Sequence, residues 1–136
     1  MKLPEDFVPG DENIEVIELP TTINWIEDGI LFFHTKPDLD HTLDLAKEHQ
    51  EVIGKLSKGE RTPILADARQ ARPLDVETRK YYATAEGTKY AIAFAFLVKS
   101  SFSKVLANIF IKLQKLHVPT KMFTSKEEAV KWLKQQ

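Results

Sequence analysis

The sequence predicts an α/β domain whose mixed sheet is opened by an antiparallel hairpin and continued by alternating helices and mostly parallel strands. An Asp-Gly pair at positions 28–29 separates two runs rich in β-branched and aromatic residues, which is the strongest short-range signal for a hairpin. The segment AIAFAFLV, residues 91–98, has no polar residue, as is typical of a strand covered on both faces. Apolar residues recur with a helical period between and after these strands.

The first half of the chain supplies three strands, a helix and a fourth strand. IEVIEL at 14–19 precedes the two strands of the hairpin, and TPILADA at 62–68 is expected to be a short buried strand. Between them, a three-to-four residue spacing of apolar side chains predicts a helix over 38–57, with Gly59 as its stop. These elements form the opening side of the predicted sheet.

The second half alternates helices and strands. Asp75 as N-cap and Gly87 as terminator predict a helix in DVETRKYYATAEGTK. After 91–98, a helical stripe runs up to Pro119, consisting of Phe102, Val105, Leu106, Ile109, Phe110, Leu113 and Leu116. TKMFT then predicts a strand, and TSKEEAVKWLKQQ predicts a final helix with a capping box at Thr124 or Ser125. Strand-helix-strand units of this kind join parallel strands through right-handed crossovers.

Length and composition indicate one globular domain. The chain has 136 residues, 43% of them hydrophobic and 29% charged, so it can bury a core without crosslinks. We expect a single domain at 13–136, preceded by a flexible acidic lead-in at 1–12, where Pro, Gly and acidic residues dominate. With no cysteine, disulfides and thiolate metal sites are excluded.

Charge and hydropathy narrow the classes of partner. The formal net charge of -1 provides no field to attract nucleic acid. No stretch resembles a signal peptide or a membrane span, so we expect a cytoplasmic protein without membrane insertion.

Several spaced segments carry a family resemblance: EDGILFF, ILADA, ETRKYYA, AIAFAFLV, SSFSKVLANIFIKL and above all VPTKMFTSKEEAVKWL. Together they resemble, over roughly residues 14–135, an uncharacterised bacterial family with the SpoIIAA-like, or STAS, fold. Better known proteins of that fold are anti-sigma-factor antagonists, which dock on a kinase-like partner and are switched by phosphorylation of a serine at a helix N-terminus. The corresponding segment here, 67–77, has neither serine nor threonine. The resemblance therefore implies the fold, and docking on a protein partner, without the usual phosphoserine switch.

Two loops are candidates for a binding site, because ligands of open parallel sheets collect beyond the carboxyl ends of the strands. In the first, Asp67, Arg69 and Arg72 offer a carboxylate with two guanidiniums, which would clamp an anion bidentately. The alternative is that Asp67 pairs with one of the arginines and holds the loop.

The second loop leads into the predicted helix after residue 98. Ser100 or Ser101 is expected to be the N-cap of that helix. The alternative is an anion bound at the helix start with the help of Lys99 and Lys104. The candidate ligand- or partner-binding residues are therefore Asp67, Arg69, Arg72, Lys99, Ser100, Ser101 and Lys104.

Catalytic and metal motifs do not occur in the sequence. GxxxxGK, GxGxxG and GxSxG are absent, and the four histidines show no HExxH or HxxxH spacing. His41 and His49 lie two turns apart and would at most form a weak, solvent-exposed metal cluster. We expect no cofactor and no metal, and an enzyme using Asp67 and Arg69 is the less favoured class.

The sequence favours a non-enzymatic protein-interaction or regulatory module of the STAS type. A homodimer, formed through a sheet edge or the helix containing Asn108, is a further expectation. The alternative is a carrier or sensor for a small apolar or anionic ligand, which predicts a cavity of some hundreds of Å³. The cleft of such a carrier would be lined by aromatic residues that core packing explains equally: Phe94, Phe96, Phe102, Phe110, Tyr81, Tyr82 and Trp132.

Overall fold

The structure is a computed structural model of the protein and describes residues 2–100, 104, 108 and 116–136. These residues form a six-stranded sheet in the order β1-β2-β3-β4-β5-β6. The strands are β1 (Ile17–Glu18), β2 (Thr22–Glu27), β3 (Ile30–Thr35), β4 (Thr62–Asp67), β5 (Ala91–Leu97) and β6 (Thr120–Phe123). β1, β2 and β3 pair antiparallel, and β3 to β6 pair parallel, which confirms the predicted mixed sheet.

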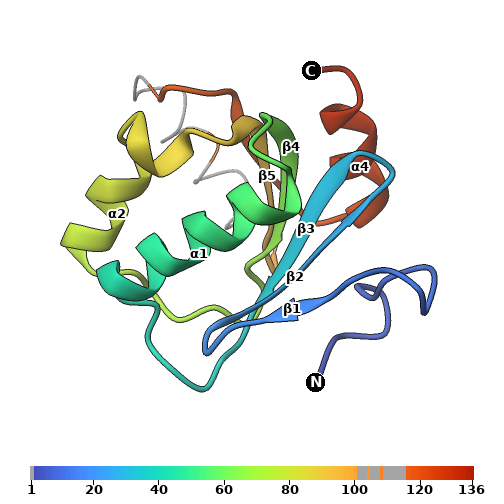
Figure 1. The fold of residues 1–136 in the computed structure, drawn as a ribbon, viewed down its shortest axis with the longest axis horizontal. Helices are drawn as coiled ribbons and strands as arrows, with labels where there is room; N and C mark the ends of the chain where they lie inside the picture. The colour runs from blue at the N-terminus through green and yellow to red at the C-terminus, as the bar shows by residue number, and fades with distance from the viewer. Residues whose placement is uncertain (1, 101–103, 105–107, 109–115) are drawn as a thin grey trace.

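The described helices are α1 (Leu43–Leu56), α2 (Val76–Tyr82), the short 3-10 helix η1 (Glu86–Thr88) and α4 (Lys126–Leu133). The helix predicted over 102–116 lies largely outside the described residues. Figure 1 shows α1 and α2 on one side of the sheet and α4 on the other.

The turn between β2 and β3 has the backbone geometry that the Asp-Gly pair predicts. Asp28 has a φ of 53° and Gly29 a φ of 72°, and both central residues of a type I′ turn need positive φ. The register places Glu27 opposite Ile30, so the two strands are joined by the two-residue turn alone.

The helices α1 and α2 are both shorter than the sequence pattern predicts. α1 begins at Leu43 rather than near 38, because the Thr42 hydroxyl accepts a hydrogen bond from the Leu45 amide at 3.3 Å and caps the helix there. α2 has the predicted N-cap, since the Asp75 carboxylate accepts from the Thr78 amide at 2.8 Å. It ends at Tyr82, and the chain then forms η1.

Gly87 lies in η1, where the backbone comes very close to the end of α2. A Cβ at this position would lie 2.0 Å from the backbone oxygen of Tyr81. Any side chain would force the two segments apart, so the connection between α2 and β5 requires glycine.

The two faces of the sheet carry different clusters because side chains alternate along each strand. On the face covered by α4, here called the closed face, the buried cluster includes Trp25, Phe32, Leu65, Ala95 and Leu133. On the face covered by α1 and α2, here called the open face, the buried cluster consists of Leu31, Ile53, Ile64, Ala91, Phe94 and Val118. β5 lies between β4 and β6 and contributes to both clusters, as an apolar strand covered on both sides should.

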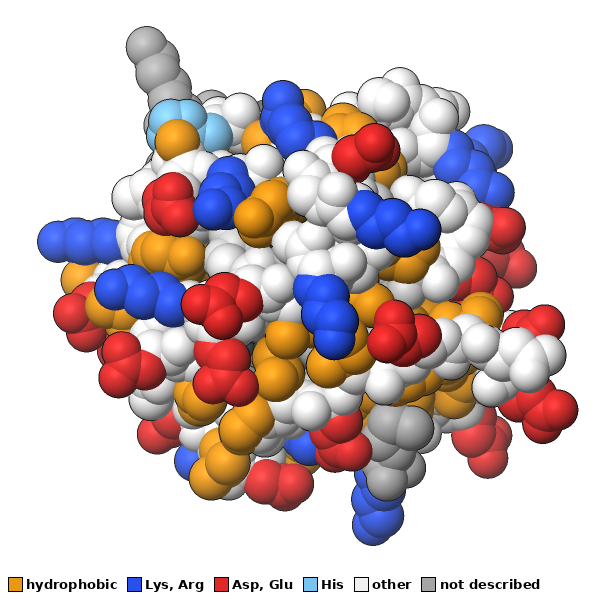
Figure 2. Space-filling model, in the orientation of Figure 1, with side chains coloured by type: hydrophobic (Ala, Val, Ile, Leu, Met, Phe, Trp, Pro, Cys, Tyr) orange, Lys and Arg blue, Asp and Glu red, His pale blue; other side chains and the backbone are white. Residues whose placement is uncertain are grey.

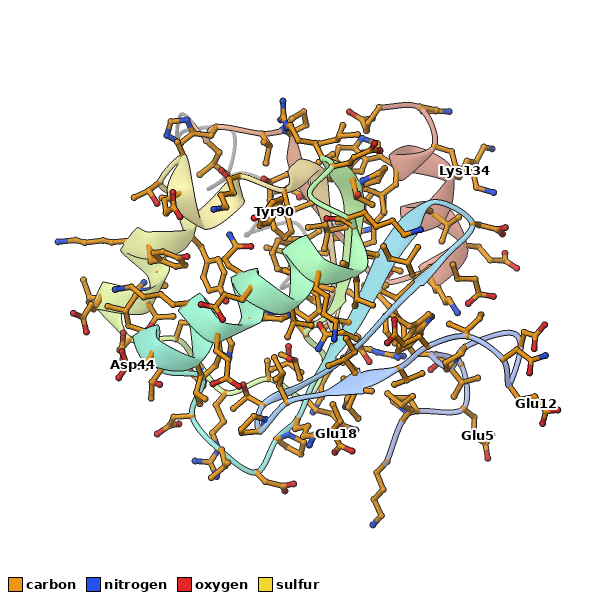
Figure 3. The ribbon with its side chains drawn as sticks, in the orientation of Figure 1. Glu5, Glu12, Glu18, Asp44, Tyr90 and Lys134 are labelled. Carbon is orange, nitrogen blue, oxygen red and sulfur yellow. The ribbon has the colours of Figure 1, made fainter. Side chains whose placement is uncertain are left out.

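Residues 2–12, here called the N-terminal strap, differ from the expected flexible lead-in. Phe7 is fully buried on the closed face, with its ring centroid 5.4 Å from that of Trp25 and 5.8 Å from that of Phe32. The Gly10 amide donates to the Glu27 carboxylate at 3.1 and 3.2 Å. Phe7, with Leu3 beside it, packs the strap against the closed-face cluster, while Figure 3 shows the acidic side chains of Glu5 and Glu12 pointing away from the sheet.

Candidate ligand pocket

A pocket of about 710 Å³ lies on the open face of the sheet. Its floor is formed by side chains of β3, β5 and β6 and of the segment that leads into β6, namely Phe33, Thr35, Phe94, Phe96, Thr120, Met122, Leu116, His117 and Val118. The rings of Phe94 and Phe96 are stacked, with centroids 5.6 Å apart and planes 14° apart. The floor is therefore mainly apolar and aromatic.

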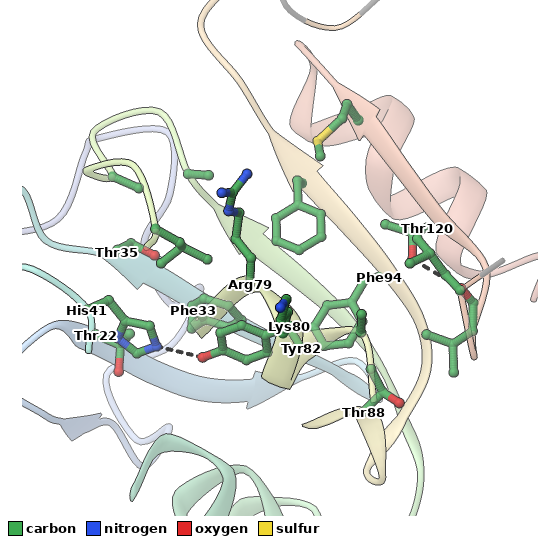
Figure 4. A pocket seen from close by; sticks show the side chains of 18 of the residues that line it. Thr22, Phe33, Thr35, His41, Arg79, Lys80, Tyr82, Thr88, Phe94 and Thr120 are labelled. Atoms are coloured by element: carbon green, nitrogen blue, oxygen red, sulfur yellow. Dashed lines mark hydrogen bonds between the residues drawn. The ribbon is translucent and has the colours of Figure 1, made fainter. Parts of the chain in front are cut away.

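The wall of the pocket comes from α2 and from the loop between β4 and α2. Ala68, Ala71, Arg72 and Leu74 contribute from the loop. Val76, Arg79, Lys80 and Ala83 contribute from α2 and its C-cap. Their spacing of three, one and three residues places them on one stripe of the helix, so α2 presents an apolar-cationic stripe to the floor (Figure 4).

The charged groups of the described pocket lining are all basic: Arg72, Arg79 and Lys80, with His117 as a further nitrogen base. The Arg72 side chain is already hydrogen-bonded within the protein, because its guanidinium donates to the backbone oxygens of Pro37 at 2.8 Å and Asp38 at 3.1 Å. Arg79 and Lys80 have no ion pair and no side-chain hydrogen bond with the described part of the chain.

One end of the pocket carries a short chain of hydrogen-bonded side chains. The Thr21 hydroxyl and His41 Nδ1 are 2.8 Å apart, and His41 Nε2 is hydrogen-bonded to the Tyr82 hydroxyl. Burial lowers the pKa of His41 and raises the pKa of Tyr82. Both groups are therefore neutral at pH 7, and this end of the pocket is polar but uncharged.

A buried histidine supports this end from α1. His49 is 1% exposed, and its Nε2 lies 2.6 Å from Asn24 Oδ1. The Asn24 amide donates to the Ile17 carbonyl and the Thr22 hydroxyl, so its oxygen accepts and His49 Nε2 donates. Burial, with the nearby His41, lowers the pKa of His49 to about 3. His49 is a neutral structural group under the pocket.

Asp67 and Arg69 are brought together on the closed face. Asp67 is fully buried and accepts from His34 Nδ1 at 2.9 Å and from Arg69 Nε at 2.8 Å. Arg69 in turn makes a two-bond contact with Asp6 of the N-terminal strap, at 2.8 and 2.9 Å. Burial alone would raise the pKa of Asp67, but the hydrogen bonds from His34 and Arg69 lower it to about 2. This chain of ion pairs connects the strap to the end of β4.

The other sequence-predicted site residues are spread over different places. Arg72 lies in the pocket wall, on the opposite side of the sheet from Asp67 and Arg69. The Ser100 carbonyl accepts from the Lys104 amide at 3.0 Å, which is the hydrogen bond expected of an N-cap residue. Lys99 is exposed and Lys104 is half-buried, and neither lines the pocket. Ser101 lies outside the described residues.

His41 and His49 do not form a solvent-exposed pair, because His49 is buried and His41 is hydrogen-bonded through both ring nitrogens. In the described part of the chain, no group of three or more His, Cys, Asp or Glu side chains could hold a metal ion. Among the same residues, no helix has the length and hydropathy needed to cross a membrane.

The pocket explains part of the predicted aromatic set. Phe94, Phe96 and Tyr82 line it, whereas Trp132 packs against the closed-face cluster. Phe102 and Phe110 lie outside the described residues. Sequence reasoning missed Phe33, Arg79 and Lys80. A signal for the two cations was present, since a stripe of α2 carries Arg and Lys beside Val76 and Ala83 at positions where a core-facing helix would be apolar.

Comparisons with known proteins place the fold. No curated protein matches the chain. The chain is similar to the crystal structure of an uncharacterised protein of the DUF3478 family with a SpoIIAA-like fold from Shewanella loihica PV-4, at 15% identity, with a TM-score of 0.56, 88% of this chain and 91% of that chain covered. This likeness confirms the SpoIIAA-like fold that the sequence resemblance implied. The family profile described as "Domain of unknown function (DUF7793)" matches residues 24–136, and the chain therefore belongs to the DUF7793 family.

Proposed function

We propose that this domain binds a small, largely apolar molecule in the open-face pocket and acts as its carrier or sensor. The observation that carries the proposal is the pocket itself, about 710 Å³ with an aromatic floor. Sites for small ligands in proteins have volumes of roughly 300–1,000 Å³ and are mostly apolar, with a few polar groups. The volume and the lining both agree with that class of site.

The exposure of the floor also supports binding over simple core packing. Phe33 and Phe96 are only half-buried, and the apolar side chains Leu74, Leu116 and Met122 around them are half-buried too. By contrast, the closed face buries Phe7, Trp25 and Phe32 almost completely. A ligand on the open face would remove apolar surface from water, which favours binding by about 25 cal/mol per Å² before the costs of association.

A docked protein partner is the second candidate, and one observation favours it. The side chains of Leu39 and Val76 are 51% and 55% exposed. Arg72 of the pocket wall places both residues nearby, because it hydrogen-bonds to the backbone just before Leu39 and precedes Val76 by four residues in the chain. Two large apolar side chains therefore lie beside the pocket wall. On the face seen in Figure 2, basic and acidic side chains are interspersed around apolar atoms, which suits a protein partner better than a polyanion.

Dimerisation through β6 would compete with an existing contact. The Asn108 side chain accepts from the Met122 amide at 2.8 Å and donates to the Met122 carbonyl at 3.2 Å. This amide occupies the backbone edge of β6 that a second copy would need for strand pairing.

The test of the carrier hypothesis is binding of decanol, an uncharged single-chain probe, measured by calorimetry on the purified chain. Ala83→Trp places a ring into the pocket from α2, and we expect it to weaken decanol binding at least tenfold. Ala85→Trp is the matched control, because Ala85 is exposed and does not line the pocket. Absence of decanol and decanoate binding to the natural chain, or equal affinity in Ala83→Trp, would overturn the proposal.

A further inference from the structure

We infer that the ligand of this pocket is an anionic amphiphile, whose negative head group is held by Arg79 and Lys80 while its apolar chain lies over Phe94 and Phe96. This inference rests on the proposed function and adds the chemical class of the ligand. It follows from the charges of the pocket lining, the pairing of the other cations and the direction of the α2 stripe.

Arg79 differs from the other arginines in that its guanidinium donates no hydrogen bond to the part of the chain that the structure describes. Arg61 donates to the Ala91 carbonyl, Arg69 to Asp6 and Asp67, and Arg72 to the 37–40 loop. Arg79 donates to no described atom, although it lies one turn after the Asp75 carboxylate, whose pKa it helps to lower. A guanidinium without a partner can form two parallel hydrogen bonds with a carboxylate or phosphate.

Arg79 and Lys80 are exposed like other surface charges, but both also line the pocket. Both belong to the stripe of α2 that lines the pocket, together with Val76 and Ala83. In the view of Figure 4, Lys80 lies between the rings of Phe33 and Phe94, and the Arg79 side chain extends past them. Their aliphatic stems can cover apolar surface while the charged ends reach the water, so a head group bound there would have its chain directed onto the floor.

The described lining contains no carboxylate. Nothing in it would neutralise Arg79 and Lys80 or attract a cationic ligand. The other polar end does not supply positive charge, because burial lowers the pKa of His41, which is hydrogen-bonded to Thr21 and Tyr82. Recognition of charge is therefore concentrated at α2, and the Thr21-His41-Tyr82 end is suited to a neutral hydroxyl or carbonyl group.

The experiment compares decanoate, decyl phosphate, decanol and decyltrimethylammonium, which share one chain length and differ in the head group. We expect decanoate or decyl phosphate to bind at least tenfold more tightly than decanol, and decyltrimethylammonium to bind more weakly than decanol. The preferred anion identifies the head group as carboxylate or phosphate. Equal affinity for decanol and both anions would overturn the inference while leaving the carrier hypothesis standing.

The variant R79Q/K80Q tests the residues. We expect it to lower the affinity for the preferred anion about tenfold and to leave decanol binding unchanged. The control K47Q/K134Q removes the same charge from two exposed lysines that do not line the pocket, and should leave both affinities unchanged. A loss of anion binding that is equal in the two variants would show a general charge effect and overturn the assignment to Arg79 and Lys80.

Discussion

The closed and open faces of the sheet are built from alternate residues of the same strands, yet the described part of the chain fills them to different extents. On the closed face, Phe7, Trp25 and Phe32 interlock, with Trp25 and Phe32 stacked at 5.6 Å. On the open face, Phe33 and Phe96 are only half-covered, and a pocket of about 710 Å³ remains. The strap and α4 fill the closed face, whereas α2 leaves a pocket over the open face.

Removing the strap's aromatic ring should have the largest effect. Phe7→Ala deletes a fully buried side chain from the closed-face core, and Phe→Ala in a core costs about 3–5 kcal/mol. We expect the free energy of unfolding, measured by urea titration, to fall by about 3 kcal/mol. The neighbouring Val8→Ala is the control, because Val8 is 41% exposed and should change stability by less than about 0.5 kcal/mol. Equal effects of the two would mean that the strap does not hold the closed face.

The next effect is a loss of stability in mild acid through His49, which lies on the open-face side. Burial lowers its pKa from 6.5 to about 3, so below pH 6.5 the unfolded chain takes up a proton that the folded chain does not. The contribution of neutral His49 to the free energy of unfolding is fully present above pH 6.5. It should fall by about 1.4 kcal/mol per pH unit as the pH drops toward 3.

Urea unfolding at several pH values between 7.5 and 4.5 measures this dependence. His49→Gln keeps a donor for Asn24 and should flatten the pH dependence. A slope that is the same in the natural chain and in His49→Gln would refute the assignment to this histidine.

Asp67 should give a smaller effect at more acidic pH, on the closed face. Its pKa is lowered from 3.8 to about 2 by its net interactions, so its contribution is present above pH 4 and is lost as the pH falls through 2. This difference in pKa between the unfolded and folded chain corresponds to about 2 kcal/mol in the free energy of unfolding. Asp67→Asn should remove this amount at pH 7, measured by urea unfolding. Glu51→Gln, on an exposed site of α1, is the control and should leave the stability within about 0.5 kcal/mol.

The smallest change in stability is expected from Phe96→Ala on the pocket floor. The ring is half-buried and stacks on Phe94, so its removal should cost about 1 kcal/mol. The same variant should weaken decanol binding, because the floor loses an aromatic surface. A cost as large as that of Phe7→Ala, measured in the same urea assay, would mean that the two faces are equally packed.

The sequence predicted most of the fold because the decisive signals are local. The Asp28-Gly29 turn, the caps at Asp75 and Ser125, and the apolar strand at 91–97 all act over a few residues. Of the two capping residues considered for the last helix, Ser125 is the one that accepts from the Glu128 amide, at 3.3 Å.

Phe7 and the pocket could not be predicted in the same way. Phe7 stands in a polar segment, and its burial depends on Trp25 and Phe32, which lie far along the chain. A pocket is a gap between elements, and its volume depends on how far α2 stands from the sheet rather than on any residue type. Core packing and pocket lining therefore produce the same aromatic pattern in the sequence, as Phe94 and Phe96 show.

The placement of the two tryptophans has an optical consequence. Trp25 belongs to the closed-face cluster and Trp132 packs against it, so both indole rings lie across the sheet from the pocket. Tryptophan emission should respond when the strap lifts away and water reaches Trp25, and stay constant while a molecule enters the other side. Tryptophan fluorescence should therefore report whether the strap is attached, independently of whether a ligand occupies the pocket.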